Sequence, residues 1–422
     1  MRSVIASSAA LLFGFGILQL GDGLQGTLLG LRASLEGFPT PVTGVVMSMF
    51  YVGFLGGCLY AGKLIERVGH IRVFGALASV ASAAVLIHGV FVNPGVWGLL
   101  RFLSGFCFAG LYIVAESWLN ARADNNTRGQ LLSVYMIVTY ASVGGGQLLL
   151  NVAAPTGLEL FILTSVLISV ALVPLLLSAG PAPKFEESLS VTVRQMIAFS
   201  PLGTFGAFAT GMASGALFGM GPVFAGVAGL DVRETSVFMA ALVLGAVLLQ
   251  WPIGRLSDKL DRRRVLSVVA FLAVAAAVAL PFTMDLSVMA LVVGISLFGG
   301  LSIPLYALCI AHANDYLQPE QIVGASAALV LVNGAGAALG PVTVSAAMAI
   351  GGANGFFWSL AAMHAAVGLF AVYRMFRRPA RPLREQGPYA PTAPQRSPVA
   401  VEWSQHAVRQ QAEDTPDELQ ES

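Results

Sequence analysis

A short charged sequence that occurs twice, each time between long apolar runs, constrains the fold of this chain most. Residues 62–72 read GKLIERVGHIR, and residues 254–264 read GRLSDKLDRRR. Both copies place Gly first, Leu third, a carboxylate fifth and Arg eleventh. Because each copy joins two apolar runs long enough to cross a membrane, the repeat predicts a chain built from two related halves.

The composition excludes a soluble protein. The 422 residues are 56% hydrophobic and 11% charged, with a mean hydropathy of +0.77, whereas soluble domains carry about 25% charged residues. We therefore interpret the chain as a polytopic helical membrane protein. The net charge of +1 does not point to a nucleic-acid partner. The three cysteines lie far apart inside apolar runs, so we interpret them as small apolar side chains and expect no metal or cofactor.

Twelve apolar runs have the roughly 20 residues that a spanning helix needs. They cover residues 8–30, 42–62, 72–92, 96–118, 130–152, 158–178, 200–224, 235–254, 265–283, 286–311, 322–350 and 353–374. We predict an all-α polytopic membrane protein with twelve transmembrane helices in two pseudo-symmetric six-helix bundles. The bundles comprise residues 1–178 and 200–375. A central cytoplasmic loop covers 179–199, and the Pro-rich segment 376–422 is predicted to be a disordered cytoplasmic tail.

The distribution of Lys and Arg predicts the orientation. With the N-terminus in the cytoplasm, the positive charges of the loops gather on the inner side, and only Arg32 and Arg233 fall on the outer side. The positive-inside rule then places both termini in the cytoplasm. We expect a multi-pass protein of the cell membrane, the inner membrane if the source is bacterial. The inner loop near 314–322 has no positive charge, which this rule does not explain.

Asp22 is the most informative single residue, because a carboxylate inside a spanning helix is costly and usually functional. Counting along the helices places Asp22 roughly 21 Å above the inner boundary. Arg101 of the fourth helix lies roughly 7 Å below the outer boundary of a core about 30 Å thick, at a similar depth. We predict that the two pair, directly or through water, and couple transport to protons. The alternative is a fixed ion pair that only sets helix packing.

Further polar residues near the expected midplane predict a moderately polar cavity around Asp22. Each of them could instead make an ordinary hydrogen bond between helices. The candidate substrate contacts are Gln19, Gln25, Tyr51, Tyr140, Ser142, Gln147, Ser214 and Asn333. The glycines at 211, 215 and 219 recur every four residues, a spacing that favours close helix packing over cavity lining.

The charged loops predict a cytoplasmic gate in each half. Ion pairs at a surface contribute roughly 0–1 kcal/mol each, so a few of them suit a latch that must open in every cycle. The alternative is that these charges are solvated and only set the topology. The gate candidates are Gly62, Glu66, Arg67, Gly69, Arg72 and Glu116 in the first half, and Gly254, Asp258, Arg262, Arg264 and Asp315 in the second.

Nothing in the sequence indicates an enzyme. Residues 21–26 spell G-x-G-x-x-G, but they lie inside a predicted helix with no preceding strand, so they cannot form a dinucleotide-binding loop. His312 and Asp315 lie close together, yet one His and one Asp do not make a zinc site. No combination of residues typical of nucleophilic catalysis is present.

The two charged loops resemble the loop 2–3 and loop 8–9 signatures of the major facilitator superfamily, and RFLSG at 101–105 resembles its helix 4 Arg motif. The runs ESWLN at 116–120 and YALCIAHAND at 306–315 resemble the YcaD-like branch. The resemblance covers residues 5–375. It implies two bundles that rock about a site lined by helices 1, 4, 7 and 10, gating by the loops, and proton coupling through a helix 1 carboxylate.

The sequence departs from the family pattern at three places. Glu66 stands where Asp is usual, Asp261 stands where Gly is expected, and helix 5 has glycines at 144–146 but no proline, which leaves the antiporter signature incomplete. We therefore predict a secondary transporter of a small organic solute, with either direction of transport open, acting as a monomer in the lipid bilayer. The alternative is a transport-inactive sensor or scaffold that acts through its tail; a channel has less support.

Overall fold

The computed structural model describes residues 2–123, 127–178, 191–318, 321–392 and 397–413 of the chain. The first half contains α1 (Arg2–Leu35), α2 (Thr40–Val68), α3 (His70–Val90), α4 (Pro94–Arg122), α5 (Arg128–Leu148) with the 3-10 turn η1 (Leu149–Val152), and α6 (Glu159–Ser178). The second half contains α7 (Val193–Phe199), α8 (Pro201–Val227), α9 (Val232–Lys259), α10 (Arg262–Met284), α11 (Val288–Ser302), α12 (Pro304–Asn314), α13 (Ile322–Gly351) and α14 (Asn354–Arg377). The turn η3 (Leu383–Glu385) and α15 (Pro398–Glu413) follow.

The all-α membrane fold predicted from the sequence is confirmed. Among the described residues, eleven helical segments are long and apolar enough to cross a membrane. Each contains or overlaps one of the predicted runs, with α11 and α12 forming one continuous segment, Val288–Asn314. The remaining predicted run, 8–30, lies inside α1, which is 34 residues long.

Local sequence signals explain where the helices begin. The Asn93 side chain accepts hydrogen bonds from the backbone of the first turn of α4, and Pro94 occupies the first helical position, where its missing N–H is not needed. Asp231 and Glu234 form a reciprocal capping box at the start of α9. Gly69 separates α2 from α3 with a φ of 91°, which favours glycine.

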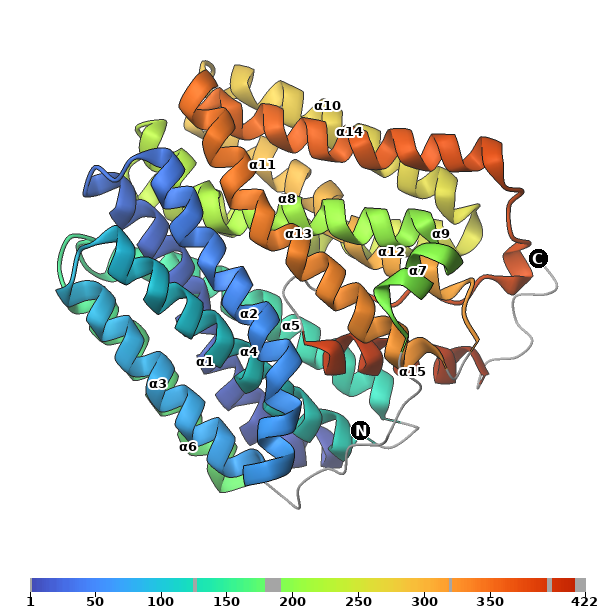
Figure 1. Ribbon diagram of the computed structural model, residues 1–422, viewed down its shortest axis with the longest axis horizontal. Helices are drawn as coiled ribbons and strands as arrows, with labels where there is room; N and C mark the ends of the chain where they lie inside the picture. The colour runs from blue at the N-terminus through green and yellow to red at the C-terminus, as the bar shows by residue number, and fades with distance from the viewer. Residues whose placement is uncertain (1, 124–126, 179–190, 319–320, 393–396, 414–422) are drawn as a thin grey trace.

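The helices pack as two groups (Figure 1). In the first half α1 packs on α5 and α6, and α2 packs on α4. In the second half α8 packs on α13, and α10 packs on α14. The groups meet through α1 with α8, α2 with α13 and α5 with α9. One end of the molecule carries the loops 66–72 and 259–264 and the end of α14; we call it the arginine-rich end.

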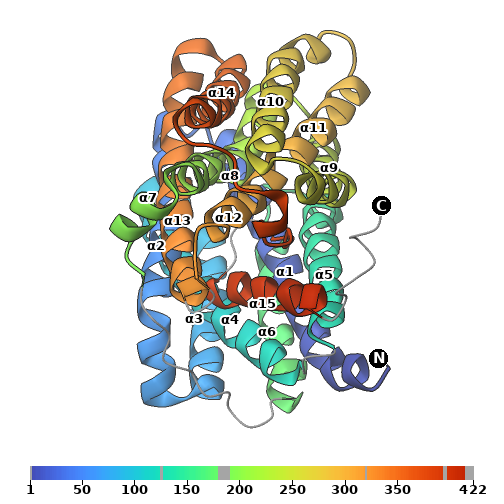
Figure 2. The ribbon, with the colours of Figure 1, turned by 90° about the vertical axis from the view of Figure 1, so that its right-hand side faces the viewer.

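The tail differs from its predicted disorder. Residues 398–413 form α15, which lies across the arginine-rich end between α13 and the ends of α4 and α5 (Figures 1 and 2). Ala400, Trp403, Ser404 and Ala407 are buried and recur at the spacing of one helical face. The helix therefore forms because it has a surface to pack against. Residues 393–396 and 414–422 of the predicted tail, and 179–190 of the predicted central loop, lie outside the described residues.

Candidate functional site

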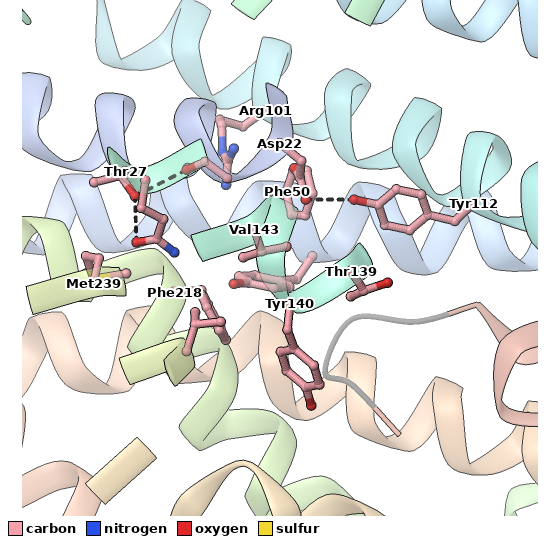
Figure 3. A pocket seen from close by; sticks show the side chains of 15 residues that line it. Asp22, Thr27, Phe50, Arg101, Tyr112, Thr139, Tyr140, Val143, Phe218 and Met239 are labelled. Carbon is pink, nitrogen blue, oxygen red and sulfur yellow. Dashed lines mark hydrogen bonds between the residues drawn. The ribbon is translucent and has the colours of Figure 1, made fainter. Parts of the chain in front are cut away.

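A cavity of about 70 Å³ lies between the two helix groups, near the middle of the membrane-spanning segments. Helices α1, α2, α4 and α5 of the first half form most of its wall, and α8 and α9 of the second half complete it (Figure 3). The lining residues are Asp22, Gly23, Gly26, Thr27, Phe50, Tyr51, Arg101, Tyr112, Thr139, Tyr140, Val143, Gln147, Phe218, Met239 and Val243. The cavity thus combines one carboxylate and one guanidinium with several aromatic rings.

Asp22 is held by a neighbouring tyrosine. The Tyr112 hydroxyl donates a hydrogen bond of 2.7 Å to Asp22 Oδ2 (Figure 3). Tyr112 is itself fixed by edge-on contacts with the rings of Phe15 and Phe54, whose centroids lie 5.8 and 6.1 Å away. Since hydrogen bonds to ionised groups contribute about 1.5–3 kcal/mol, this contact positions the carboxylate of Asp22.

Arg101 lies in the same cavity, and its guanidinium is covered by an aromatic ring. Its side chain is 4% exposed, and the guanidinium carbon lies 4.3 Å from the centroid of the Phe50 ring. Asp22 is close enough for its charge to act on the guanidinium. The Nε of Arg101 has no hydrogen-bond partner among the described residues. A cation shielded from water therefore faces the cavity, and its Nε–H is available to donate a hydrogen bond.

The structure brings only some of the predicted cavity residues together. Tyr51, Tyr140 and Gln147 line the cavity with Asp22 and Arg101, whereas the lining set in the described chain does not include Gln19, Gln25 or Ser142. Ser214 and Asn333 lie at a separate small void of about 10 Å³ inside the second half. There the Asn333 amide donates to the Ala207 carbonyl and the Ser214 hydroxyl donates to the Gly211 carbonyl. Asn333 thus joins α13 to α8, whereas the hydrogen bond of Ser214 stays within α8.

Sequence reasoning missed three polar lining residues, Tyr112, Thr27 and Thr139. Tyr112 follows Arg101 by eleven residues, close to three helical turns, so the helical period alone could have placed it on the same face of α4. The Thr27 hydroxyl donates to the Gln147 side chain at 3.2 Å and joins α1 to α5. No sequence signal distinguishes Thr139 from the other hydroxyl residues of α5.

A second charged site lies at the arginine-rich end of the second half. Arg262 is buried and forms ion pairs of 2.6 Å with Asp315 and 3.3 Å with Asp258. Burial raises the pKa of the Asp315 carboxyl to about 6, although the Arg262 guanidinium acts in the opposite direction. Three of the predicted gate residues therefore meet. The fourth charged candidate, Arg264, is exposed, and the adjacent Arg263 pairs with Asp261 instead.

The corresponding charges of the first half do not meet. Glu66, Arg67 and Arg72 are exposed, and none of them forms an ion pair with another described residue. Glu116 is fully buried and accepts hydrogen bonds from the Tyr135 hydroxyl, at 2.6 Å, and from the Ser397 hydroxyl. The predicted first-half network is thus not assembled in this conformation. The glycines at 62, 69 and 254 lie at or beside the same loops, and Gly254 packs against the ring of Tyr389.

The tail contacts carboxylates of both halves at the arginine-rich end. The Gly387 N–H donates to Asp315 at 3.0 Å, and the Tyr389 N–H donates to Asp258 at 2.8 Å. On the other side, Ser397 contacts Glu116. The tail therefore bridges the two halves at the arginine-rich end, where the sequence predicts a gate made of loop charges alone. Within the described part of the chain no cluster of His, Cys, Asp and Glu could hold a metal ion.

Comparisons with known proteins agree with this architecture. The sequence model of the Major Facilitator Superfamily matches residues 11–313 and, in a second match, residues 203–410. The uncharacterized MFS-type transporter YcaD of Salmonella arizonae is 30% identical over 333 residues, which cover 78% of this chain and 86% of that protein. YcaD of Escherichia fergusonii is 29% identical over the same shares. The predicted resemblance to the YcaD-like branch is therefore confirmed.

Solved structures share the fold at low sequence identity. The nucleoside transporter NupG superposes with a TM-score of 0.70 at 13% identity, covering 88% of this chain and 99% of that one. A bacterial homolog of the human lysosomal transporter Spinster, in an inward-facing and unoccupied conformation, superposes with a TM-score of 0.66 at 14% identity and covers 97% and 99%. These likenesses concern the fold alone. Together with the sequence matches, they show that the chain belongs to the major facilitator superfamily and is a multi-pass membrane transporter.

Proposed function

We propose that this transporter is a secondary active transporter that moves a small organic solute by alternating access and couples that movement to protons through Asp22. One arrangement carries the proposal. Asp22 lies in a cavity between the two halves, accepts a hydrogen bond from Tyr112, and shares the cavity with the buried cation of Arg101. A scaffold has no need of an ionisable pair at this depth, because such groups are costly inside a membrane.

The chemistry of coupling follows from the position of Asp22. Its hydration depends on how far the two halves separate, because residues from both halves form the wall of the cavity. A change in hydration alters the balance between the ionised and the protonated carboxyl group. Opening toward one side therefore loads a proton, and opening toward the other side releases it. Tyr112 holds Asp22 in position in both states.

The positive-inside rule places the arginine-rich end in the cytoplasm. Helix α15 lies between the two halves at that end, beside α4, α5 and α13 (Figure 2). The opposite end is packed, since the Ser34 hydroxyl of α1 donates to the Val223 carbonyl of α8 and Gly30 faces Pro222. In the proposed cycle this is an inward-facing conformation, in which the tail occupies the opening between the two halves. The tail must leave before the two halves can close there.

Proteoliposomes that contain a pH-sensitive dye test the coupling. Sugars, amino acids, organic acids and cationic drugs are added in turn, and proton movement is recorded for the wild type and for Asp22→Asn. We expect a solute that triggers proton flux only when Asp22 is present. Asp285→Asn is the matched control, because Asp285 is an exposed carboxylate in a loop. A solute that crosses the membrane equally fast in both variants, without proton flux, would show a uniporter and refute the role of Asp22.

The docked tail favours a second candidate function, that of a membrane sensor which signals through its tail. The observation behind it is that the tail contacts ionisable residues of both halves, so a rearrangement of the halves would release it. Removal of residues 382–422 separates the two functions. Loss of a cellular response with unchanged solute flux would favour the sensor, whereas altered flux would favour a transporter whose tail limits its cycle.

A further inference from the structure

A larger space, here called the lateral cleft, lies between α5 and α9 and has a volume of about 1240 Å³. Its walls are mostly aliphatic, and they include Leu244 and Val247, which are 54% and 47% exposed on the membrane-facing side of α9. Gly144 and Gly145 remove side chains from the opposite wall, on α5. The cleft therefore offers an apolar channel at the depth of the lipid chains.

The lateral cleft and the central cavity share two wall residues, Tyr140 and Val243. The Tyr140 hydroxyl donates a hydrogen bond of 2.7 Å to the Gln250 side chain of α9, which joins the two helices at this point. A Cβ atom added at Gly144 would lie 3.8 Å from Val243 Cγ1, an ordinary van der Waals contact, so only a side chain larger than Ala would fill the space beside Val243. Tyr140 and Val243 therefore form the boundary between the cleft and the cavity.

The routes along the membrane normal are packed in this conformation. At the opposite end, the Ser48 hydroxyl of α2 donates to the Ala338 carbonyl of α13. At the arginine-rich end, the ring of the buried Trp403 lies 5.2 Å from that of Tyr135, and the Asn314 amide donates to Gln405 at 2.7 Å. The cavity is thus flanked by protein at both ends and by the lateral cleft at its side.

The cavity offers a cation to a ligand. Arg101 is buried, and its Nε lacks a hydrogen-bond partner among the described residues, as does the Thr139 hydroxyl in the same wall. A guanidinium binds a carboxylate through two parallel hydrogen bonds. A second carboxylate is repelled by Asp22 unless one of the two groups is protonated. The 70 Å³ of the cavity accommodate a small head group and leave no room for a long chain.

We infer, resting on the proposed transport function, that the substrate is a single-chain amphiphile with a carboxylate head group, which enters from the bilayer through the lateral cleft. The carboxylate binds Arg101, and the chain stays in the cleft between α5 and α9. Arg255, whose guanidinium carbon lies 3.9 Å from the centroid of the Trp251 ring at the arginine-rich end of the cleft, attracts the head group at the membrane surface. Protonation of Asp22 accompanies binding of the anion.

Binding of spin-labelled stearic acid to the full-length protein in nanodiscs tests this inference. The uncharged methyl ester of the same labelled acid is the matched ligand. Loss of a charged hydrogen-bonded pair weakens binding by about tenfold or more. We therefore expect Arg101→Gln to weaken binding of the acid at least about tenfold and to leave binding of the ester unchanged. Arg101→Lys, which keeps the charge but not the two-pronged geometry, should fall between wild type and Arg101→Gln.

A second variant tests the cleft independently of the charge. Gly144→Leu places a side chain beside Val243 and should weaken binding of both the acid and the ester. Gly75→Leu adds the same side chain on α3, where an added Cβ meets open space away from the cleft, and should change neither. Equal binding of acid and ester in every variant would overturn the inference. So would a water-soluble solute that drives Asp22-dependent proton flux while the acid does not bind, although that result would leave the proposed transport function intact.

Discussion

Trp403 gives the sharpest test of how the tail is held. Its side chain is fully buried against Tyr135, and its indole N–H has no hydrogen-bond partner in the described part of the chain. Truncation of a buried Trp to Ala costs about 3–5 kcal/mol. Removal of an unsatisfied buried donor returns about 1–3 kcal/mol. The Trp403→Ala variant should therefore weaken docking of α15 by about 2 kcal/mol, or roughly thirtyfold.

Hydrogen exchange measures this change directly. Amides of residues 401–407 should exchange about thirtyfold faster in Trp403→Ala than in the wild type, because they exchange when α15 leaves its site. Trp358→Ala is the control, since Trp358 is a half-exposed residue of α14. The reasoning is wrong if these amides already exchange at the rate of an unfolded peptide in the wild type. It is equally wrong if these amides exchange as slowly in both Trp variants as in the wild type.

Three further predictions concern the rest of the molecule. Tyr112→Phe removes the hydrogen bond to Asp22 and should slow Asp22-dependent proton flux at least about tenfold in proteoliposomes; an unchanged rate would contradict the positioning role. The raised pKa of Asp315, about 6, means that the folded state binds this proton more tightly than the unfolded chain, so stability should fall as the pH rises from about 4 to 6. Thermal unfolding should show this slope in the wild type and lose it in Asp315→Asn, the effect being on the order of 2 kcal/mol. A Cβ at Gly105 would overlap the backbone of α2, so Gly105→Ala should lower the unfolding temperature, whereas Gly75→Ala, in open space, should not; equal temperatures would refute close packing there.

The fold could be predicted from the sequence because the membrane fixes the length of each helix. Apolar runs of about 20 residues are required by the bilayer thickness, and these runs became helices wherever the structure describes them. The sequence did not predict the helix of the tail, because the bilayer does not set its length and it depends on a surface to pack against. Its buried face comprises Ala400, Val401, Trp403, Ser404, Gln405 and Ala407, a short set of mixed apolar and polar side chains that gains little from burial unless a binding surface is present. Only its binding surface, contributed by distant residues, makes it a helix.

The repeated loop motif is correct, but one of the gate residues predicted from it, Arg264, does not join the ion pairs. The repeat aligns Arg264 with Arg72, and the sequence predicts both Arg262 and Arg264 as gate cations. In the structure Asp261 caps the start of α10, accepting a hydrogen bond from the Arg263 N–H at 3.0 Å. The helix therefore begins at Arg262, whose side chain reaches Asp315 of the neighbouring segment, while Arg264 remains exposed. Asp261, the position that departs from the family pattern, thus caps the helix and pairs with Arg263, while Arg262 reaches the gate carboxylates.

The residues of the cavity could not be predicted from their depth in the membrane alone. Residues at one level of the membrane share a site only if their helices turn the same faces inward, and a sequence does not give that rotation. Helix α8 makes the point: Gly211 and Gly215 face the backbone of α13 so closely that an added Cβ would overlap it. This contact orients α8 so that Ser214 lies at the void it shares with Asn333, and Phe218, one turn further on, reaches the central cavity. The glycine stripe, interpreted from the sequence as packing, therefore decides which side chain of α8 a substrate would meet.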